Sequence, residues 1–166
     1  MPIAKKVISP ILEKPYKVKK FSVIDTHSNK YTNTNLLGKW HVVYFYPKDM
    51  TSGCTIEAND FQKKLKLFKE LDCNVMGVSK DSCVSHQKFV EKENLTFLLL
   101  SDEELKMCEA FEVWKEKSMY GKKYMGVERS TFLINPEGFV VAEWRKVKVT
   151  DHVKEVFNVL KNIQKN

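Results

Sequence analysis

The sequence is short of the residues that mark membrane, secreted and fibrous proteins. Its 166 residues include 6 glycines, 5 prolines and 4 cysteines, which excludes collagen-like and disulfide-dense compositions. No apolar run approaches the roughly 20 residues that cross a bilayer. The first residues, 1–15, alternate lysines with short apolar pairs instead of forming a signal-peptide core. We therefore expect a cytoplasmic protein that has no membrane partner.

The few cysteines are too widely spaced for the usual disulfide and zinc patterns. Cys54, Cys73, Cys83 and Cys108 stand 19, 10 and 25 residues apart, and no Cys-x-x-Cys pair occurs. A thiol-disulfide oxidoreductase normally presents such a pair. Cys83-x-x-His86 is half of a zinc pattern, but no second pair stands at a matching spacing. The cysteines therefore argue against that oxidoreductase class, a disulfide framework and a metal site.

Positive charge is in moderate excess, but it is not clustered in the way that nucleic-acid binding requires. Lysine and arginine total 28 against 21 acids, which gives a formal charge of +7. The lysines are scattered, with no basic arm and no interleaved aromatic ladder. A solvated lysine surface is the simpler interpretation, so we expect no specific nucleic-acid partner. A non-enzymatic nucleic-acid or partner-binding module stays as the alternative from another functional class.

Strand and helix patterns alternate along the chain and predict an α/β fold. The apolar run at 40–46 predicts a central strand buried on both faces. The sequence Asn135-Pro136-Glu137-Gly138 predicts a turn between two hairpin strands. We expect a single domain over 1–166, with 1–15 as an N-terminal extension and a central mixed β-sheet flanked by helices. The predicted strands are 40–46, 75–78, 97–100, 130–134 and 139–144, and the predicted helices are 54–71, 82–93, 103–111 and a last one beginning at 150 or 151.

Cys54 is the only cysteine placed where a predicted strand gives way to a helix. A sulfur in the first turn of a helix faces free backbone N–H groups and the positive end of the helix dipole, which favour thiolate over thiol. Thr51, three residues earlier, can bring its hydroxyl within hydrogen-bond reach of the sulfur, and Pro47 fixes the chain beside it. The alternative is an ordinary helix-capping turn.

The order of these residues resembles a known active-site motif. Pro47-x-x-x-Thr51-x-x-Cys54 matches the PxxxTxxC motif of the peroxiredoxins. The sequence around it is similar to the bacterioferritin comigratory protein, or PrxQ, subfamily. Further blocks resemble that subfamily in the same order, so the similarity covers about 21–160. These blocks are 77–82, 99–102, 120–122 and 129–134.

The resemblance implies a thioredoxin-like fold and a thiol peroxidase that reduces hydrogen peroxide and alkyl hydroperoxides without a metal or organic cofactor. By the motif, Cys54 would be the peroxidatic nucleophile, Pro47 and Thr51 would shape its pocket, and Arg129 would be the cation beside the thiolate. The resemblance also implies a monomer that uses thioredoxin as reductant. From spacing alone, Arg129 would be a surface arginine at the edge of a strand.

The sequence departs from the subfamily at the thiol that would resolve the oxidised cysteine. Many members carry this cysteine five residues after the first, where this chain has Asn59. Others carry it on the next helix, at a position that corresponds to Val90. A sulfenic acid on Cys54 must still be reduced by some thiol.

Cys83 is the best candidate for the resolving thiol, because it opens the helix predicted at 82–93. It stands seven residues before Val90, which is two helical turns, so the two side chains share a face. Cys73 and Cys108 have apolar neighbours typical of buried core cysteines. The competing hypothesis is a one-cysteine enzyme recycled directly by an external thiol, and spacing does not decide between the two.

Overall fold

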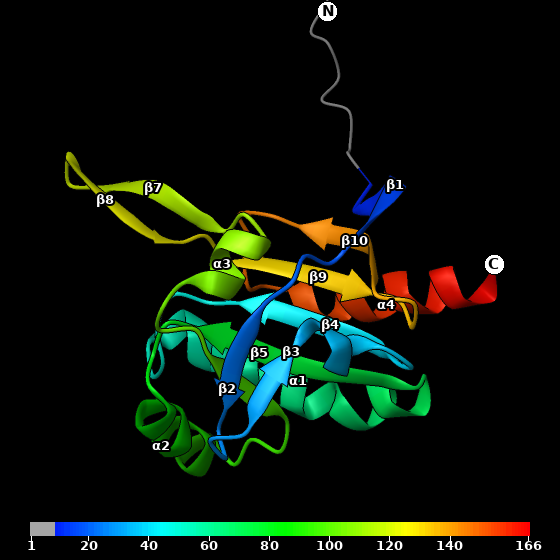
Figure 1. Cartoon of the computed structure of the whole chain (residues 1–166), viewed down its shortest axis with the longest axis horizontal. Helices are drawn as coiled ribbons and strands as arrows, with labels where there is room; N and C mark the ends of the chain where they lie inside the picture. The colour runs from blue at the N-terminus through cyan, green and yellow to red at the C-terminus, as the bar shows by residue number, and fades with distance from the viewer. Residues whose placement is uncertain (1–8) are drawn as a thin grey trace, which may run out of the picture.

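The computed structural model describes residues 9–166, and an eight-stranded mixed sheet forms its centre. The strands of this sheet are β1 (Ile11–Lys17), β2 (Ser22–Asp25), β3 (Lys30–Thr32), β4 (Trp40–Phe45), β5 (Cys73–Ser79), β6 (Leu98–Ser101), β9 (Ser130–Ile134) and β10 (Phe139–Trp144). Their order across the sheet is β1-β10-β9-β4-β5-β6-β2-β3 (Figure 1). β4, β5 and β6 run parallel, whereas β9 lies antiparallel to β4. The expected α/β fold with a mixed sheet is confirmed.

Helices cover both faces of this sheet. They are α1 (Ser52–Glu70), α2 (Cys83–Glu93), α3 (Lys106–Ala110) and α4 (His152–Lys165), with a short 3₁₀ turn, η1 (Asn33–Leu36). Side chains of α1, α2 and α4 pack into one hydrophobic cluster, and side chains of α3 pack into a second one. None of the helices within residues 9–166 is long and apolar enough to cross a membrane.

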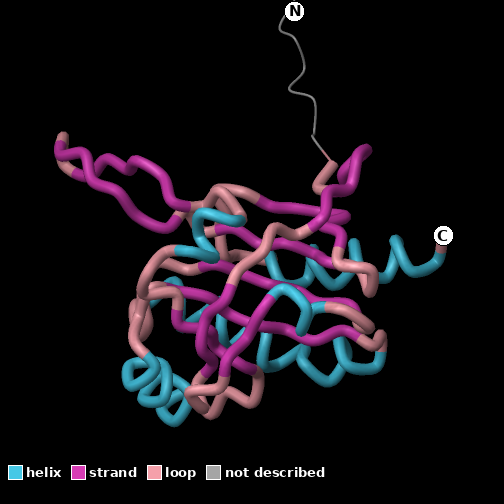
Figure 2. The backbone as a smooth tube through the Cα atoms, in the orientation of Figure 1, coloured by secondary structure: helices cyan, strands magenta, loops and turns pink. Residues whose placement is uncertain are grey.

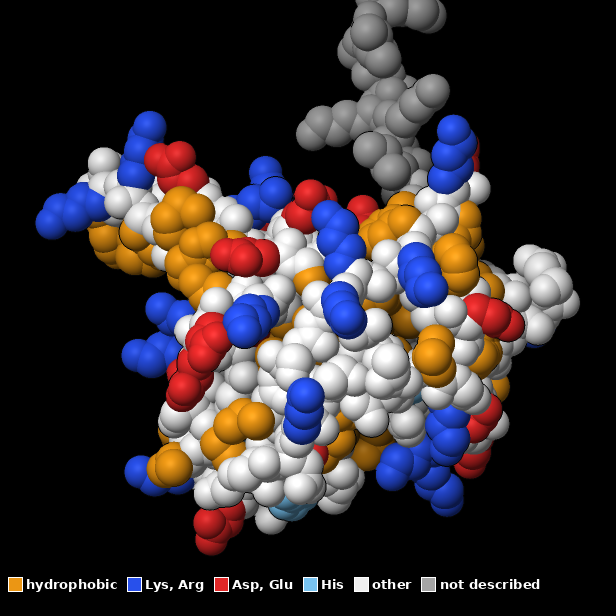
Figure 3. Space-filling model, in the orientation of Figure 1, with side chains coloured by type: hydrophobic (Ala, Val, Ile, Leu, Met, Phe, Trp, Pro, Cys, Tyr) orange, Lys and Arg blue, Asp and Glu red, His pale blue; other side chains and the backbone are white. Residues whose placement is uncertain are grey.

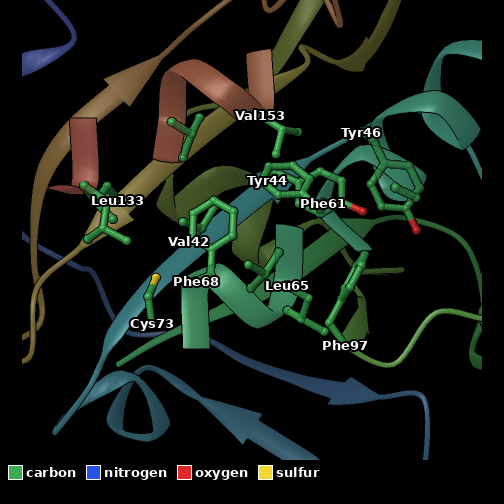
Figure 4. Packing of buried hydrophobic residues seen from close by; sticks show 14 of the residues in the cluster. Val42, Tyr44, Tyr46, Phe61, Leu65, Phe68, Cys73, Phe97, Leu133 and Val153 are labelled. Carbon is green, nitrogen blue, oxygen red and sulfur yellow. The ribbon is translucent and has the colours of Figure 1, made fainter. Parts of the chain in front are cut away.

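The strand β4 lies at the centre and sends side chains into both clusters. Val42 and Tyr44 pack on one face, and Val43 and Phe45 pack on the other. Figure 4 shows Val42 and Tyr44 among the aromatic side chains of α1. All four side chains are fully buried, as the apolar run at 40–46 predicts. The C-terminal end of β4 therefore has little freedom, which fixes where the next loop begins.

A separate two-stranded sheet projects from the body of the molecule. It consists of β7 (Trp114–Met119) and β8 (Lys122–Val127), which form an antiparallel hairpin (Figures 1 and 2). Tyr120 at its tip is almost fully exposed. Elsewhere on the face seen in Figure 3, lysine and arginine side chains are scattered among acidic and apolar ones. That distribution agrees with a solvated lysine surface.

The structure adds the strands β2, β3, β7 and β8, which were not predicted, and it changes the extent of two predicted segments. The helix expected at 103–111 is shorter, because Asp102 accepts hydrogen bonds from the backbone N–H groups of Met107 and Cys108 and so begins α3 at Lys106. The extension expected at 1–15 overlaps β1, which pairs with β10 from Ile11 onward. Its first part, residues 1–8, lies outside the described residues.

Candidate active site

Cys54 lies in the first turn of α1, directly after the loop that leaves β4. The helix begins at Ser52 with Thr51 as its N-cap residue, so Cys54 is the third helical residue. Its side chain is 1% exposed. The predicted position at a strand-to-helix transition is confirmed, and the sulfur lies at the end of the helix where backbone N–H groups are free.

Arg129 reaches Cys54 from the short segment between β8 and β9. Its Nη2 donates to Cys54 Sγ at 3.3 Å, and its Nη1 donates to Glu57 Oε1 at 2.7 Å. The Arg129 side chain is 16% exposed, so its interpretation as a surface arginine is wrong. The guanidinium passes close to Gly53, where a Cβ atom would lie 3.3 Å from Arg129 Nη2 and would require a shift of a few tenths of an ångström.

Glu57 completes the charged group, although the sequence did not single it out. It lies three residues after Cys54 on α1 and is fully buried. Burial raises the pKa of Glu57 to about 7, against the lowering effect of the Arg129 cation. Burial also lowers the pKa of Arg129, but Glu57 and Cys54 outweigh it and raise that pKa overall. The signal in the sequence was the shared helix face of Glu57, Cys54 and the buried Phe61.

Thr51 and Pro47 lie in the loop that leads into α1, and neither forms a hydrogen bond to the sulfur. The Thr51 hydroxyl donates to the Lys48 carbonyl at 2.9 Å, so the hydrogen bond expected between Thr51 and Cys54 is not formed. Thr51 is the N-cap residue of α1 with an extended backbone, and its hydroxyl is engaged by a carbonyl of the preceding loop rather than by the sulfur. Pro47 is half-buried at the start of that loop.

Cys83 lies at the start of α2, where it faces another part of the chain. Its Sγ donates to the carbonyls of Asp25 and Thr26 at 3.4 and 3.3 Å. All four cysteines are free thiols, and within residues 9–166 no hydrogen bond links Cys83 to Cys54. Cys73 and Cys108 are buried in the core, and burial raises the pKa of both thiols.

Comparison with known proteins agrees with this geometry. The profile of the AhpC/TSA family matches residues 16–143. The chain belongs to this family. Among its curated relatives, Peroxiredoxin Bcp of Bacillus subtilis is 60% identical over 126 residues, which cover 76% of this chain and 80% of the relative. Peroxiredoxin Bcp of Escherichia coli K12 is 40% identical over 142 residues, which cover 86% and 91%.

Solved structures of peroxiredoxins have the same fold as this family member. A cysteine-to-serine mutant of Xanthomonas campestris Peroxiredoxin Q superimposes with a TM-score of 0.82 at 46% identity, covering 86% of this chain and 90% of that chain. Peroxidoxin BcpB of Mycobacterium tuberculosis gives 0.80 at 28% identity, covering 92% and 98%. The resemblance to the bacterioferritin comigratory protein subfamily and the thioredoxin-like fold that it implied are confirmed.

A second polar cluster in this peroxiredoxin lies beside the active-site loop. Ligand-type atoms of Asp49, Asp81 and His86 lie within 4.8 Å of one another. Asp81 Oδ2 already accepts hydrogen bonds from Ser79 Oγ and from the Asp49 backbone N–H. His86 faces Asp49, whereas Cys83 faces Thr26, so the two residues of the half zinc pattern do not converge. The cluster is a hydrogen-bonded network in which both Asp49 carboxylate oxygens and Asp81 Oδ2 have protein partners.

Proposed function

We propose that this chain is a thiol peroxidase that reduces hydrogen peroxide and alkyl hydroperoxides at Cys54. The observation that carries the proposal is the approach of Arg129 Nη2 to within 3.3 Å of Cys54 Sγ in the first turn of α1. A cation and a helix N-terminus both favour the thiolate, which is the nucleophile. A trapped-intermediate study of the Xanthomonas campestris bacterioferritin comigratory protein concerns alkyl peroxide reduction, which supports the same substrate class here.

In the proposed first step, the Cys54 thiolate attacks one oxygen of the peroxide. An S–O bond forms, the O–O bond breaks, and the leaving oxygen takes the electron pair and a proton to depart as water or an alcohol. Cys54 is left as a sulfenic acid. Arg129 and the free N–H groups of α1 supply donors for the negative charge that develops. Since the Thr51 hydroxyl proton is directed to Lys48, the Thr51 oxygen is left to accept from the peroxide O–H.

We propose that Cys83 resolves the sulfenic acid and that thioredoxin reduces the product. The Cys83 thiol and the sulfenic acid would form a disulfide and release water, and a dithiol would then restore both cysteines. A disulfide needs Cα atoms within roughly 7 Å. Cys83 Sγ is bonded to the carbonyls of Asp25 and Thr26, so the first turn of α1 must open during this step.

The test begins with Cys54→Ser, which should remove peroxide turnover and leave the fold intact. Mass mapping of the parent after one equivalent of peroxide should then show a disulfide between Cys54 and Cys83. Cys83→Ser should lose thioredoxin-supported turnover, whereas small thiols still reach the sulfenic acid. Cys73→Ala is the matched control, because this buried thiol takes no part in the proposal.

The outcomes separate the hypotheses. Retained turnover in folded Cys54→Ser contradicts the peroxidase assignment. A Cys83→Ser variant as fast as the parent with thioredoxin leaves the one-cysteine enzyme recycled by an external thiol. A binding module would instead show no cysteine-dependent turnover and a steep salt-dependent affinity for nucleic acid.

We propose that the enzyme works as a monomer, because one chain supplies every group that the first step uses. Cys54, Glu57 and Arg129 contact one another within a single copy. Sedimentation of the active protein, measured with and without peroxide, tests this proposal, and a dimer in both states would contradict it. The cytoplasmic location and the absence of a specific nucleic-acid partner stay predictions.

A further inference from the structure

The loop between β4 and α1 is tied to α2 through one buried carboxylate. Asp49 lies between Pro47 and Thr51, yet its side chain is only 1% exposed. Its Oδ1 accepts from the Tyr46 hydroxyl at 2.6 Å. Its Oδ2 accepts from Ser85 Oγ at 2.8 Å and lies 2.7 Å from His86 Nδ1. Two of these three partners belong to α2, so the carboxylate joins the active-site loop to that helix.

His86 holds this carboxylate in one place, because both of its ring nitrogens are engaged. The ring is fully buried. Its Nε2 lies 3.0 Å from the Leu100 carbonyl of β6, an acceptor that requires a proton on Nε2. Its Nδ1 at the same time lies 2.7 Å from Asp49 Oδ2, so the ring cannot turn away without losing a buried hydrogen bond. The active-site loop is thus fastened through His86 to the central sheet.

The backbone of the same loop shows why it needs fastening. Met50 has a φ of +63°, a left-handed conformation that is unfavourable for a residue with a side chain. Such conformations persist where the surrounding contacts hold them, and they gather at segments that switch. The Asp49 N–H, one residue before Met50, donates to Asp81 Oδ2 at 2.9 Å. Backbone and side chain of Asp49 therefore hold the loop together.

We infer that Asp49 and His86 are positioning residues whose buried contact holds the loop of Pro47 and Thr51 closed for peroxide reduction and is released when Cys54 is resolved. The inference rests on the proposed function. Thr51 is the N-cap of α1 and lies two residues after Asp49, so the loop cannot move without disturbing the first turn that carries Cys54. Separation of Asp49 from His86 frees the loop from α2 and lets this turn open.

Two substitutions of His86 separate positioning from simple stability. His86→Asn places its amide N–H near the position of Nδ1 and keeps the bond to Asp49, whereas it loses the bond to Leu100. His86→Gln places its amide N–H near the position of Nε2 and keeps the Leu100 bond, whereas it loses the bond to Asp49. Each variant sacrifices one buried hydrogen bond of the same ring, so the two form a matched pair.

The measurements are the rate constant for Cys54 oxidation by hydrogen peroxide and amide hydrogen exchange in 47–54. His86→Gln should slow oxidation about tenfold and speed exchange about tenfold, as expected for the loss of one buried hydrogen bond to a charged group. His86→Asn should stay within about twofold of the parent in both. If His86→Gln does not fold, Asp49→Asn replaces it, because the asparagine keeps an acceptor for Tyr46 and removes the charge that faces His86.

Distinct results overturn the inference and the proposed function. Equal effects in His86→Gln and His86→Asn, or faster exchange with unchanged oxidation rates, overturn the positioning role of Asp49 and His86. A parent protein that fails to consume peroxide through Cys54 overturns the proposed function itself. Loss of oxidation rate in His86→Gln, with faster exchange confined to 47–54 and rescue in His86→Asn, supports the inference.

Discussion

Replacement of Glu57 by glutamine should alter how the stability of the protein depends on pH. Burial raises the pKa of Glu57 from 4.5 to about 7, although the Arg129 cation opposes the rise. Between these two pH values, the folded chain keeps a proton that the unfolded chain has released. The resulting stabilisation is fully present below pH 4.5 and is lost as the pH rises through 7. The difference between the two pKa values corresponds to about 3 kcal/mol.

Glutamine does not titrate, so the free energy of unfolding of Glu57→Gln, taken relative to that of the parent, should rise by about 3 kcal/mol from pH 5 to pH 8. Urea denaturation of both proteins at each pH unit measures this difference. Other titrating groups contribute equally to the two curves and cancel. A constant difference in the free energy of unfolding across the range would refute the reasoning. Peroxide turnover should fall meanwhile, because a neutral amide holds Arg129 Nη1 less firmly than a carboxylate does.

Three further changes probe the same region. Arg129→Ala should slow the oxidation of Cys54 by hydrogen peroxide, because the donor 3.3 Å from the sulfur is lost; an unchanged rate constant contradicts its role. Gly53→Ala should slow peroxide reduction in stopped-flow assays without lowering the melting temperature, since the new Cβ presses on Arg129 Nη2. Burial and the Arg129 cation lower the pKa of His152 to about 4. The free energy of unfolding should therefore fall as the pH drops from 6.5 through 4, and it should fall less in His152→Gln. An equal fall in both proteins, measured by urea denaturation, would contradict this.

Local chemistry determined which parts of the fold could be predicted. The strands at 130–134 and 139–144 were placed correctly at both ends, because the turn between them is built from its own residues. Asn135 Oδ1 accepts from the backbone N–H groups of Glu137 in the turn and of Phe139 just after it, and Gly138 takes a φ of +86°. By contrast, β2 and β3 were missed, since both are short, β2 depends on pairing with the distant β6, and β3, among the described strands, pairs only with β2. The β7–β8 hairpin was missed because its strands are largely exposed and rich in lysine.

The candidate site likewise has features that the sequence predicts and features that it does not. The position of Cys54 follows from the motif and from the strand-to-helix order around it. The partners of Arg129 could not be read from spacing, because Glu57 lies 72 residues away along the chain. Asp49 and His86 meet across 37 residues for the same reason. The Thr51 contact was predicted wrongly because sequence does not reveal which of two nearby acceptors a hydroxyl faces.

The two outermost strands of the large sheet affect how concentrated solutions of the protein behave. An exposed, regular edge strand is a template on which another molecule can add its own strand and begin an aggregate. At one edge, β1 contains Pro15, which has no N–H to offer, and its register shifts between Ile11 and Tyr16. At the other edge, β3 spans only three residues and begins with Lys30. The irregular register of β1 protects one edge and the short length of β3 protects the other, so neither edge supports strand addition by a second molecule.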